Sequence, residues 1–336
     1  MKFSIGYRLL QDDSLVNAIL KYRENINEVY FSMYNSKSGR GNSWMGDFNS
    51  FDAKEKQQRE LKLLHENGIK TNLLLNATCY GKDSLSRNFY NELGDMIDYC
   101  TESFGVKCVT TTSPIIAKFV KQNFEDVSTR ASVNMEIGTT EGMDYVAGYF
   151  DSFYMKREYN RNFEHIEKLK KWCDINGKKM HLLANSGCLN NCSCHFFHDN
   201  LVAHENEISA MDNAYRFDGI CKEYLSDENN LSKLKDITNF VRPEDIHLYE
   251  GFFEAAKLAT RVSDNPVRII ESYVKGKYSG NILELLEPRH NIYPYVLENG
   301  KELVLKKIHS DTPVFDGESE CSMNCHSCSH DCNKKI

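Results

Sequence analysis

The chain has 336 residues, of which 41% are hydrophobic and 26% charged, and its formal net charge is −7. This length allows one large domain or two, and the composition is that of a soluble globular protein. The acidic balance argues against a broad basic surface for nucleic acid, although a local basic groove is compatible with it. No apolar run approaches the roughly 20 residues of a membrane span, and the first residues lack a signal-peptide layout, so the sequence predicts a cytoplasmic protein without a membrane partner.

Short β-like runs alternate with amphipathic helical stretches from the first residues onward. The predicted strands cover residues 3–9, 28–33, 71–78, 107–112, 128–135, 152–158, 179–185 and 255–259. The predicted helices cover residues 14–25, 53–67, 84–104, 114–123, 140–149, 162–175 and 266–276. Repeated βα units require a parallel sheet, and eight strands favour a closed TIM-like (β/α)8 barrel over a doubly wound sheet.

The predicted barrel spans residues 1–287 and is interrupted after its seventh strand. An insertion at about 187–239 holds several cysteines, and residues 288–336 form a C-terminal extension with a second cysteine cluster. Active sites of such barrels lie at the carboxyl ends of the strands. Amides and guanidinium groups that follow the predicted strands would suit a polar or anionic small ligand. The candidate substrate-binding and catalytic residues are Asn76, Asn134, Arg157 and Arg261, with Asn185 beside them and Glu136 and Glu158 as the nearest acids.

The C-terminal cluster has the pattern C-x-x-x-C-x-x-C-x-x-x-C. Its members are Cys321, Cys325, Cys328 and Cys332. Thiols stay reduced in the cytosol, so clustered cysteines there indicate metal binding rather than disulfides. Four thiolates on one short loop favour a 4Fe–4S cluster, with tetrahedral zinc as the alternative.

A second group of cysteines lies in the insertion, directly after the seventh predicted strand. Cys188, Cys192 and Cys221 are the predicted ligands of an inner 4Fe–4S cluster, so the chain is expected to hold two clusters. Cys194, His195 or His198 would complete the set. If only three thiolates bind, one iron stays open as a Lewis acid; if four bind, the cluster only fixes the loop.

The other cysteines and histidines are interpreted one by one. Cys79 follows the third strand and is either a further ligand or a reactive thiol. Three cysteines inside predicted helices or strands are expected to be buried, because free cysteine behaves as a small hydrophobic residue. These are Cys100, Cys108 and Cys173. No role is predicted for His204, His247 or His290.

Several segments resemble the U32 family of collagenase-like peptidases. The run F-V-R-P-E-D-I-H-L-Y-E from Phe240 and the run A-K-L-A-T-R from Ala256 are similar to that family's closing "R-P-E-D-L…Y" and "K-I-x-G-R" segments. The run E-V-Y-F from Glu28 and the run N-S-G-C-L-N-N-C from Asn185 also have counterparts there. The residues after Cys192 lack the usual proline, and Thr260 replaces a glycine.

The resemblance implies a TIM-like barrel over most of residues 1–290. Several members of the family carry an oxygen-sensitive 4Fe–4S cluster and act in oxygen-independent hydroxylation of RNA bases or quinone precursors, and others are described as peptidases. The first functional hypothesis is therefore an iron–sulfur oxidoreductase, hydroxylase-like enzyme or lyase. Its substrate would be a polar small molecule, a modified nucleotide or a peptide side chain, and an electron donor protein is a possible partner.

Two alternatives remain open from the sequence. A non-catalytic protein that carries or senses clusters would also suit four cysteines in a tail. A peptidase would need a metal-bound water or a nucleophile with an adjacent base. The sequence shows no H-E-x-x-H, no G-x-S-x-G and no evident cysteine–histidine pair outside the cysteine clusters.

Overall fold

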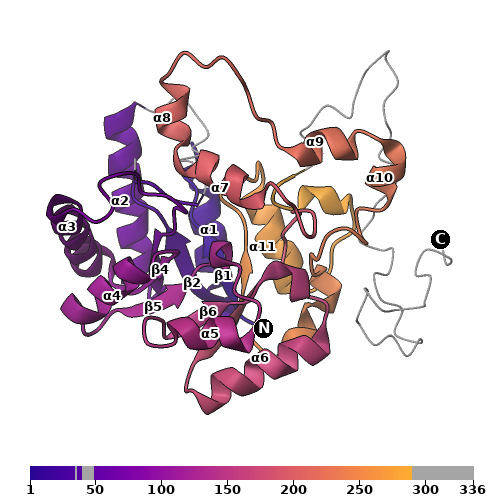
Figure 1. The fold of residues 1–336 in the computed structure, drawn as a ribbon, viewed down its shortest axis with the longest axis horizontal. Coiled ribbons are helices and arrows are strands. Elements are labelled where there is room, and N and C mark those ends of the chain that lie inside the picture. Colours follow the sequence, from indigo (N-terminus) through magenta and orange to yellow (C-terminus); the bar gives the residue numbers. More distant parts are fainter. Residues whose placement is uncertain (35, 40–48, 290–336) are drawn as a thin grey trace.

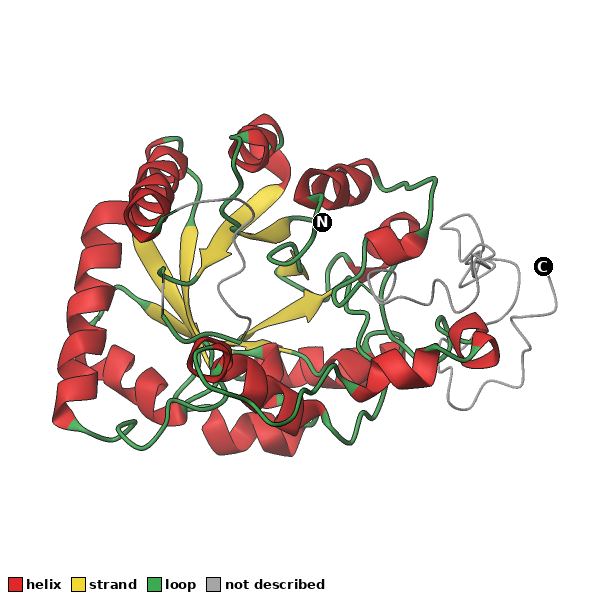
Figure 2. Ribbon diagram, turned by 90° about the horizontal axis from the view of Figure 1, so that it is seen from above, coloured by secondary structure: helices red, strands yellow, loops and turns green. Residues whose placement is uncertain are grey.

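The computed structural model describes residues 1–34, 36–39 and 49–289 and contains a closed barrel of eight parallel strands in chain order. Figure 2 shows the strands at the centre with helices around them. Pairing of β1 with β8 closes the barrel, with Ser4 beside Lys257. The strands are β1 (Phe3–Gly6), β2 (Ile26–Phe31), β3 (Thr71–Leu75), β4 (Val106–Thr111), β5 (Ser128–Ala131), β6 (Ser152–Tyr154), β7 (Lys179–Leu183) and β8 (Ala255–Leu258). The predicted TIM-like fold is confirmed.

The outer layer consists of helices that follow the strands. These are α1 (Ser14–Lys21), α2 (Ser50–Glu66), α3 (Arg87–Phe104), α4 (Pro114–Asn123), α5 (Thr140–Val146), α6 (Phe163–Ile175) and α11 (Pro266–Lys275). Local chemistry sets several of their ends. The Ser113 hydroxyl accepts a hydrogen bond from the Ile116 amide, and Pro114 occupies the first turn of α4. Helix α3 ends at Gly105, whose φ of 65° suits glycine.

All eight strands end earlier than the sequence predicts. Strand β5 ends at Ala131, and the next residues form the 3₁₀ turn η2 (Val133–Met135), where the Ser132 hydroxyl caps the Asn134 amide. Helix α3 begins at Arg87, capped by Ser86, rather than at Ser84. The sequence pattern predicts that the polar residues after each strand continue that strand. In the structure they leave the sheet and form loops at its carboxyl edge.

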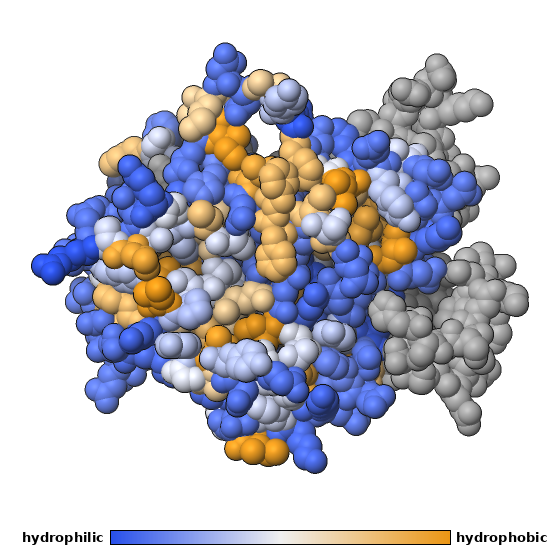
Figure 3. Space-filling view, viewed as in Figure 1, coloured by the Kyte–Doolittle hydropathy of each residue, from blue (hydrophilic) through white to orange (hydrophobic). Residues whose placement is uncertain are grey.

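The insertion after β7 is helical and lies across one end of the barrel (Figure 1). It contains α7 (His195–Ala203), α8 (Glu205–Ser209), α9 (Ile220–Leu225) and α10 (Glu228–Ser232). Apolar side chains gather on its outer face, over α7 (Figure 3), where Phe196 and Phe197 are 60% and 56% exposed. These two aromatic side chains therefore contribute little to holding the insertion against the barrel. Hydrogen bonds at the base of the insertion contribute to its position.

Those hydrogen bonds come from amides and an arginine that follow β6. Asn160 donates to the carbonyls of Leu183 and Asn239, at the two ends of the insertion. Arg161 donates to the Phe240 carbonyl at 2.8 and 3.1 Å. The two ends of the insertion are thereby joined to each other and to the barrel.

The R-P-E-D run begins the 3₁₀ helix η4 (Pro243–Tyr249) and has a structural role here. Arg242 donates to both carboxylate oxygens of Asp245 at 2.7 and 2.8 Å, and both side chains are about nine-tenths buried. The Tyr249 hydroxyl donates to the Asn160 carbonyl. This run therefore fastens the end of the insertion beside β8.

Replacing Asp245 by Asn should lower the free energy of unfolding by about 1.5–3 kcal/mol, because it leaves the buried Arg242 without its charge partner. Urea unfolding under anaerobic conditions measures this loss. Asp174→Asn is the matched control, since Asp174 pairs with Lys170 on an exposed face and should matter little. Equal losses in the two variants would contradict a fastening role for the Arg242–Asp245 pair.

Within the described part of the chain, no helix is long and apolar enough to cross a membrane. The C-terminal cysteines Cys321, Cys325, Cys328 and Cys332 and the extension that holds them lie outside the described residues, apart from Pro288 and Arg289.

Candidate active site at the barrel mouth

Three of the four candidate side chains gather around the segment after β2. Asn76 accepts a hydrogen bond from the Gly39 amide at 3.0 Å, and Arg261 donates to the Ser38 hydroxyl at 2.8 Å. A Cβ atom on Gly39 would lie only 2.6 Å from the Asn134 amide nitrogen and 2.9 Å from that of Asn76. Glycine at this position therefore lets two amide side chains approach the backbone closely. Polar side chains thus line this part of the barrel mouth.

Arg157 lies on the cysteine side of the mouth, in the short turn η3 (Arg157–Tyr159) after β6. Its guanidinium is buried and donates through Nη1 to the Cys188 sulfur at 3.3 Å. Its Nη2 lies 3.9 Å from a carboxylate oxygen of Glu136. Nε and Nη2 have no hydrogen-bond partner among the described residues. A buried guanidinium with unmade bonds is costly, so this group is suited to a further anionic or sulfur acceptor.

Glu136 is the centre of a charged group at the end of η2. Its φ of 52° lies in the left-handed region, which is uncommon for a residue other than glycine. His195 Nδ1 lies 2.5 Å from its carboxylate, and His195 Nε2 lies 3.5 Å from Asp199. Burial raises the pKa of Glu136, but His195, Arg157 and Lys156 outweigh burial and lower the pKa to about 2. Glu136 is therefore a carboxylate at neutral pH and orients His195.

The three predicted inner ligands are electrostatic neighbours. Burial raises the pKa of the Cys221 thiol, and Cys188 and Cys192 raise it further. The pKa of Cys192 is also raised, first by burial and also by Cys188 and Cys194. Among the described residues, no group of three or more His, Cys, Asp or Glu side chains is arranged to hold a single metal ion. The structure thus brings these thiols into one region without forming a compact single-ion site.

The remaining candidates for a fourth ligand differ in their surroundings. His195 is engaged by carboxylates at both ring nitrogens, as described above. Cys194 lies close enough to Cys192 to affect its pKa. The His198 ring packs against Phe217, with ring centroids 5.7 Å apart. The His198 ring also lies near Cys221, since a Cβ atom on Gly219 would be 3.3 Å from the Cys221 sulfur and 3.9 Å from His198 Cε1. Cys194 and His198 therefore both lie near predicted ligands.

Asn185 has a structural role rather than the ligand-binding role expected for it. Its amide donates to the carbonyls of Ala259 and Leu285 at 2.8 and 2.7 Å, and its oxygen accepts from the Ala259 amide. These bonds satisfy the side chain and tie β7 to β8. The predicted burial of three other cysteines, Cys100, Cys108 and Cys173, is confirmed.

Sequence reasoning missed the charged interior of the barrel. Arg130 in β5 forms a buried ion pair with Glu28 in β2, and Asn72 donates to the same carboxylate at 3.1 Å. Lys257 in β8 is buried, with its Nζ 4.2 Å from the centre of the Tyr30 ring. Charged residues within otherwise apolar strand patterns were the available signal, because a strand buried on both faces rarely carries them.

Glu287 is a further acid at the mouth that the sequence did not reveal. It is buried, and its backbone carbonyl accepts a hydrogen bond from the Gly187 amide at the start of the insertion. The expectation that Glu136 and Glu158 were the only nearby acids is therefore wrong. Glu287 follows β8 by almost thirty residues, so its position depends on how the chain returns to the barrel.

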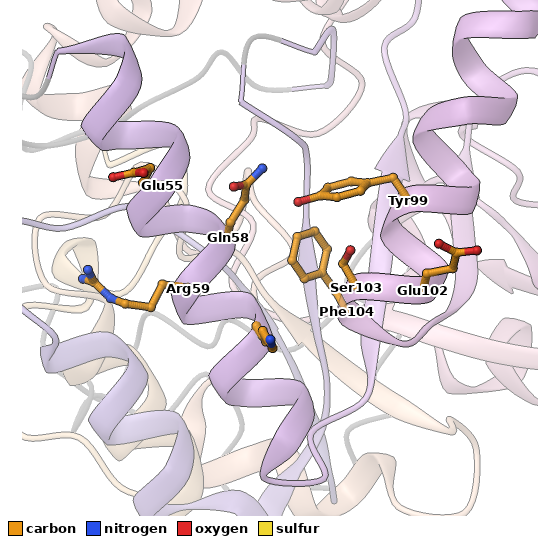
Figure 4. A pocket seen from close by; sticks show the side chains of 8 residues that line it. Glu55, Gln58, Arg59, Tyr99, Glu102, Ser103 and Phe104 are labelled. Atoms are coloured by element: carbon orange, nitrogen blue, oxygen red, sulfur yellow. The ribbon is translucent and has the colours of Figure 1, made fainter.

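A separate groove of 690 Å³ lies on the flank of the barrel, between α2 and α3 (Figure 4). Charged and polar side chains line most of it: Glu55, Gln58, Arg59, Lys62, Tyr99, Glu102, Ser103 and Phe104. The last of these residues end α3 and precede the start of β4. The groove thus lies toward the amino ends of the strands, the face that supports stability rather than catalysis in such barrels.

Comparison with known proteins supports a distant relationship to one family. No family model matches the chain. The chain is 22% identical over 303 residues to an uncharacterized protease, MJ1657, of Methanocaldococcus jannaschii, with 84% of each chain covered. It superposes on the structure of the U32 peptidase Mk0906 with a TM-score of 0.56 and 14% identity, covering 76% of this chain and 91% of the other. Together with the R-P-E-D and K-L-A-T-R segments, these matches support the resemblance of this chain to the U32 family of collagenase-like peptidases.

Proposed function

We propose that this chain is an iron–sulfur enzyme that binds a 4Fe–4S cluster at Cys188, Cys192 and Cys221, above the mouth of the barrel. Cys194 is the fourth ligand or, if the fourth iron position stays open, a neighbour of the cluster. Cys321, Cys325, Cys328 and Cys332 would hold a second cluster, for which zinc is the alternative. When bound, the inner cluster would supply electrons or, with an open iron, Lewis acidity.

The observation that carries this proposal is the environment of Arg157. A buried guanidinium donates to the Cys188 sulfur and has two further nitrogens without hydrogen-bond partners among the described residues. Thiolates and the sulfides of a cluster are acceptors of this kind, and hydrogen bonds to sulfur are one way in which proteins tune reduction potential. A four-iron cluster is also larger than a single ion, so its ligands are spaced more widely than those of a single-ion site.

The residues across the mouth fit the binding of a polar substrate. Asn76, Asn134 and Arg261 present amide and guanidinium groups around Gly39. Glu136 stays ionised at neutral pH and orients His195, which could pass a proton at the edge of the site. These roles suit a polar small molecule, a modified nucleotide or a peptide side chain, with an electron donor protein as partner. The peptidase name of the relatives is also compatible with a peptide substrate.

Replacing Cys188 by Ser should reduce bound iron from about eight to about four atoms per chain, because it removes a ligand of only one cluster. Iron, acid-labile sulfide and zinc are quantified after anaerobic purification. Arg157→Met should keep the iron but lower the midpoint potential of the inner cluster, since a positive charge and a donor to sulfur are lost.

Cys100→Ala is the matched control, because Cys100 is buried in α3 and should leave the iron content unchanged. Unchanged iron in Cys188→Ser would contradict the inner site. Zinc without sulfide in the unmodified protein would contradict iron–sulfur chemistry altogether. A cluster that transfers completely to an acceptor protein would instead favour a non-catalytic carrier.

A further inference from the structure

The last strand of the barrel carries a lysine at a position where a strand of a parallel sheet normally has an apolar residue. Lys257 is the last residue but one of β8, and its register partners are Leu183, the last residue of β7, and Ser4 of β1. It is 7% exposed, so most of the side chain is enclosed while a small part reaches the surface. Lys257 therefore lies close to the carboxyl edge of the strands, where active sites of such barrels are found.

Aromatic rings rather than a carboxylate surround the amine of this lysine. Lys257 Nζ lies 4.2 Å from the centre of the Tyr30 ring and 5.1 Å from the centre of the Tyr154 ring. Within the described residues no carboxylate forms a salt bridge with it, and the buried Glu28 is paired with Arg130. A buried ammonium without a carboxylate partner is costly, and a neutral amine avoids that cost.

The electrostatics of the barrel interior also favour the neutral amine. Burial lowers the pKa of Lys257 to about 7, and the charge of Arg261 is the next cause. Arg130 lowers this pKa further, whereas Glu287 and Glu28 act in the opposite direction. At pH 7 about half of such a lysine is neutral, against fewer than about one in a thousand for a lysine with the ordinary pKa near 10.4. The neutral amine is the nucleophilic form, and desolvated lysines are the ones with which enzymes form Schiff bases.

Tyr30 connects the amine to the polar side chains of the mouth. A Cβ atom on Gly6 would lie 2.7 Å from the Tyr30 hydroxyl oxygen and 2.8 Å from Arg261 Cγ, so these two side chains adjoin at Gly6. Arg261 in turn donates to the Ser38 hydroxyl at 2.8 Å. An amine and a guanidinium that both adjoin one tyrosine suit a small molecule with a carbonyl group and an anionic group.

We propose that Lys257 forms a Schiff base with the aldehyde or ketone carbonyl of a small anionic substrate, whose anionic group binds Arg261. A 2-oxo acid is the simplest molecule of this class. The amine nitrogen forms a bond to the carbonyl carbon, the carbon–oxygen bond breaks, and the oxygen leaves as water with both amine protons. No oxidant or reductant is consumed, and water reverses the step. This inference rests on the proposed substrate site at the mouth, through Arg261, but it does not require the iron–sulfur cluster.

The first test is reductive trapping with glyoxylate and sodium cyanoborohydride in the full-length, anaerobically purified protein at pH 7.5. Cyanoborohydride reduces the imine, so Lys257 should gain a carboxymethyl group that peptide mass spectrometry locates. We expect Lys257 to be labelled at least about 10-fold faster than Lys62, an exposed lysine of α2. Labelling of Lys257 no faster than that of Lys62, or only after unfolding in urea, would overturn the proposal.

The second test asks whether Arg261 binds the anionic group, with acetaldehyde as a probe that lacks one. Loss of the Arg261 charge raises the pKa of Lys257 and slows both reagents, so the informative quantity is the ratio of the two labelling rates. In Arg261→Met the preference for glyoxylate over acetaldehyde should fall by about 10-fold. Arg268→Met is the matched control, because Arg268 pairs with Glu284 near the surface and should leave the ratio unchanged. An unchanged ratio in Arg261→Met would overturn the role of Arg261.

Iron and acid-labile sulfide are quantified in the same samples, so that this proposal and the cluster proposal can fail separately. An unlabelled Lys257 in a protein with its full iron content would overturn the Schiff base alone. A rapidly labelled Lys257 in a protein without iron or sulfide would support the Schiff base and overturn the cluster.

Discussion

Replacing Glu28 by Gln should lower the free energy of unfolding by about 3–5 kcal/mol, because it leaves the Arg130 guanidinium charged and unpaired inside the barrel. The two side chains are 5% and 8% exposed, so water cannot replace the lost partner. Native proteins of ordinary stability have about 5–15 kcal/mol in total, so the loss should be large. Urea unfolding at pH 7 gives the measurement.

The same substitution should change how stability depends on pH. Burial raises the pKa of Glu28, but Arg130, Asn72 and Ser4 outweigh burial, and the pKa is lowered overall. A carboxyl group with a lowered pKa stabilises the folded state above its unfolded pKa near 4.3 and loses that contribution as the pH falls through the folded value. The difference between the native chain and Glu28→Gln should therefore shrink in acid.

Two further variants make this result decisive. Glu254→Gln removes an exposed partner of Lys179 and should change stability by no more than about 0.5 kcal/mol. The double variant Glu28→Gln with Arg130→Met removes both charges and should recover much of the loss. If the single variant were as stable as the native chain, the pair would not be a buried ion pair of the folded protein.

Replacing Lys257 by Met should stabilise the protein at pH 6 by about 2–4 kcal/mol. Burial, and next the charge of Arg261, lowers the pKa of Lys257 to about 7, far below the value of an exposed lysine. The ammonium lies over the Tyr30 and Tyr154 rings, at 4.2 and 5.1 Å, and these contacts offset part of the burial cost. Methionine has a similar shape and no charge.

The sign of the pH dependence follows from proton binding. Between pH 7 and about 10.4 the unfolded chain binds a proton at this lysine and the folded chain does not, so native stability rises with pH across this window. The advantage of Lys257→Met should therefore be largest below pH 7 and fade toward pH 10. Lys62→Met, at an exposed position of α2, is the matched control. Equal destabilisation of Lys257→Met at every pH would contradict this account.

The sequence was a good guide to the barrel because the signals of its elements are local. Alternation of strands and helices, Pro114 after a capping serine and Gly105 at a helix end each depend on a few neighbouring residues. The ends of the strands were predicted too late, since polar residues that leave the sheet look the same in sequence as polar residues within it. The cysteine spacing likewise pointed to Cys188 and Cys192, whose charges raise the pKa of the Cys221 thiol in the folded chain.

What the sequence by itself determined is the order of the elements, their closure into a barrel and the residue types at the strand ends. The tertiary structure decided which of those side chains meet. The Asn185 side chain binds backbone carbonyls of other segments, and Glu28 pairs with Arg130 across the barrel. The physical reason is that local periodicity depends on neighbouring residues, whereas these contacts depend on strand register around a closed barrel and on how the insertion folds back over it.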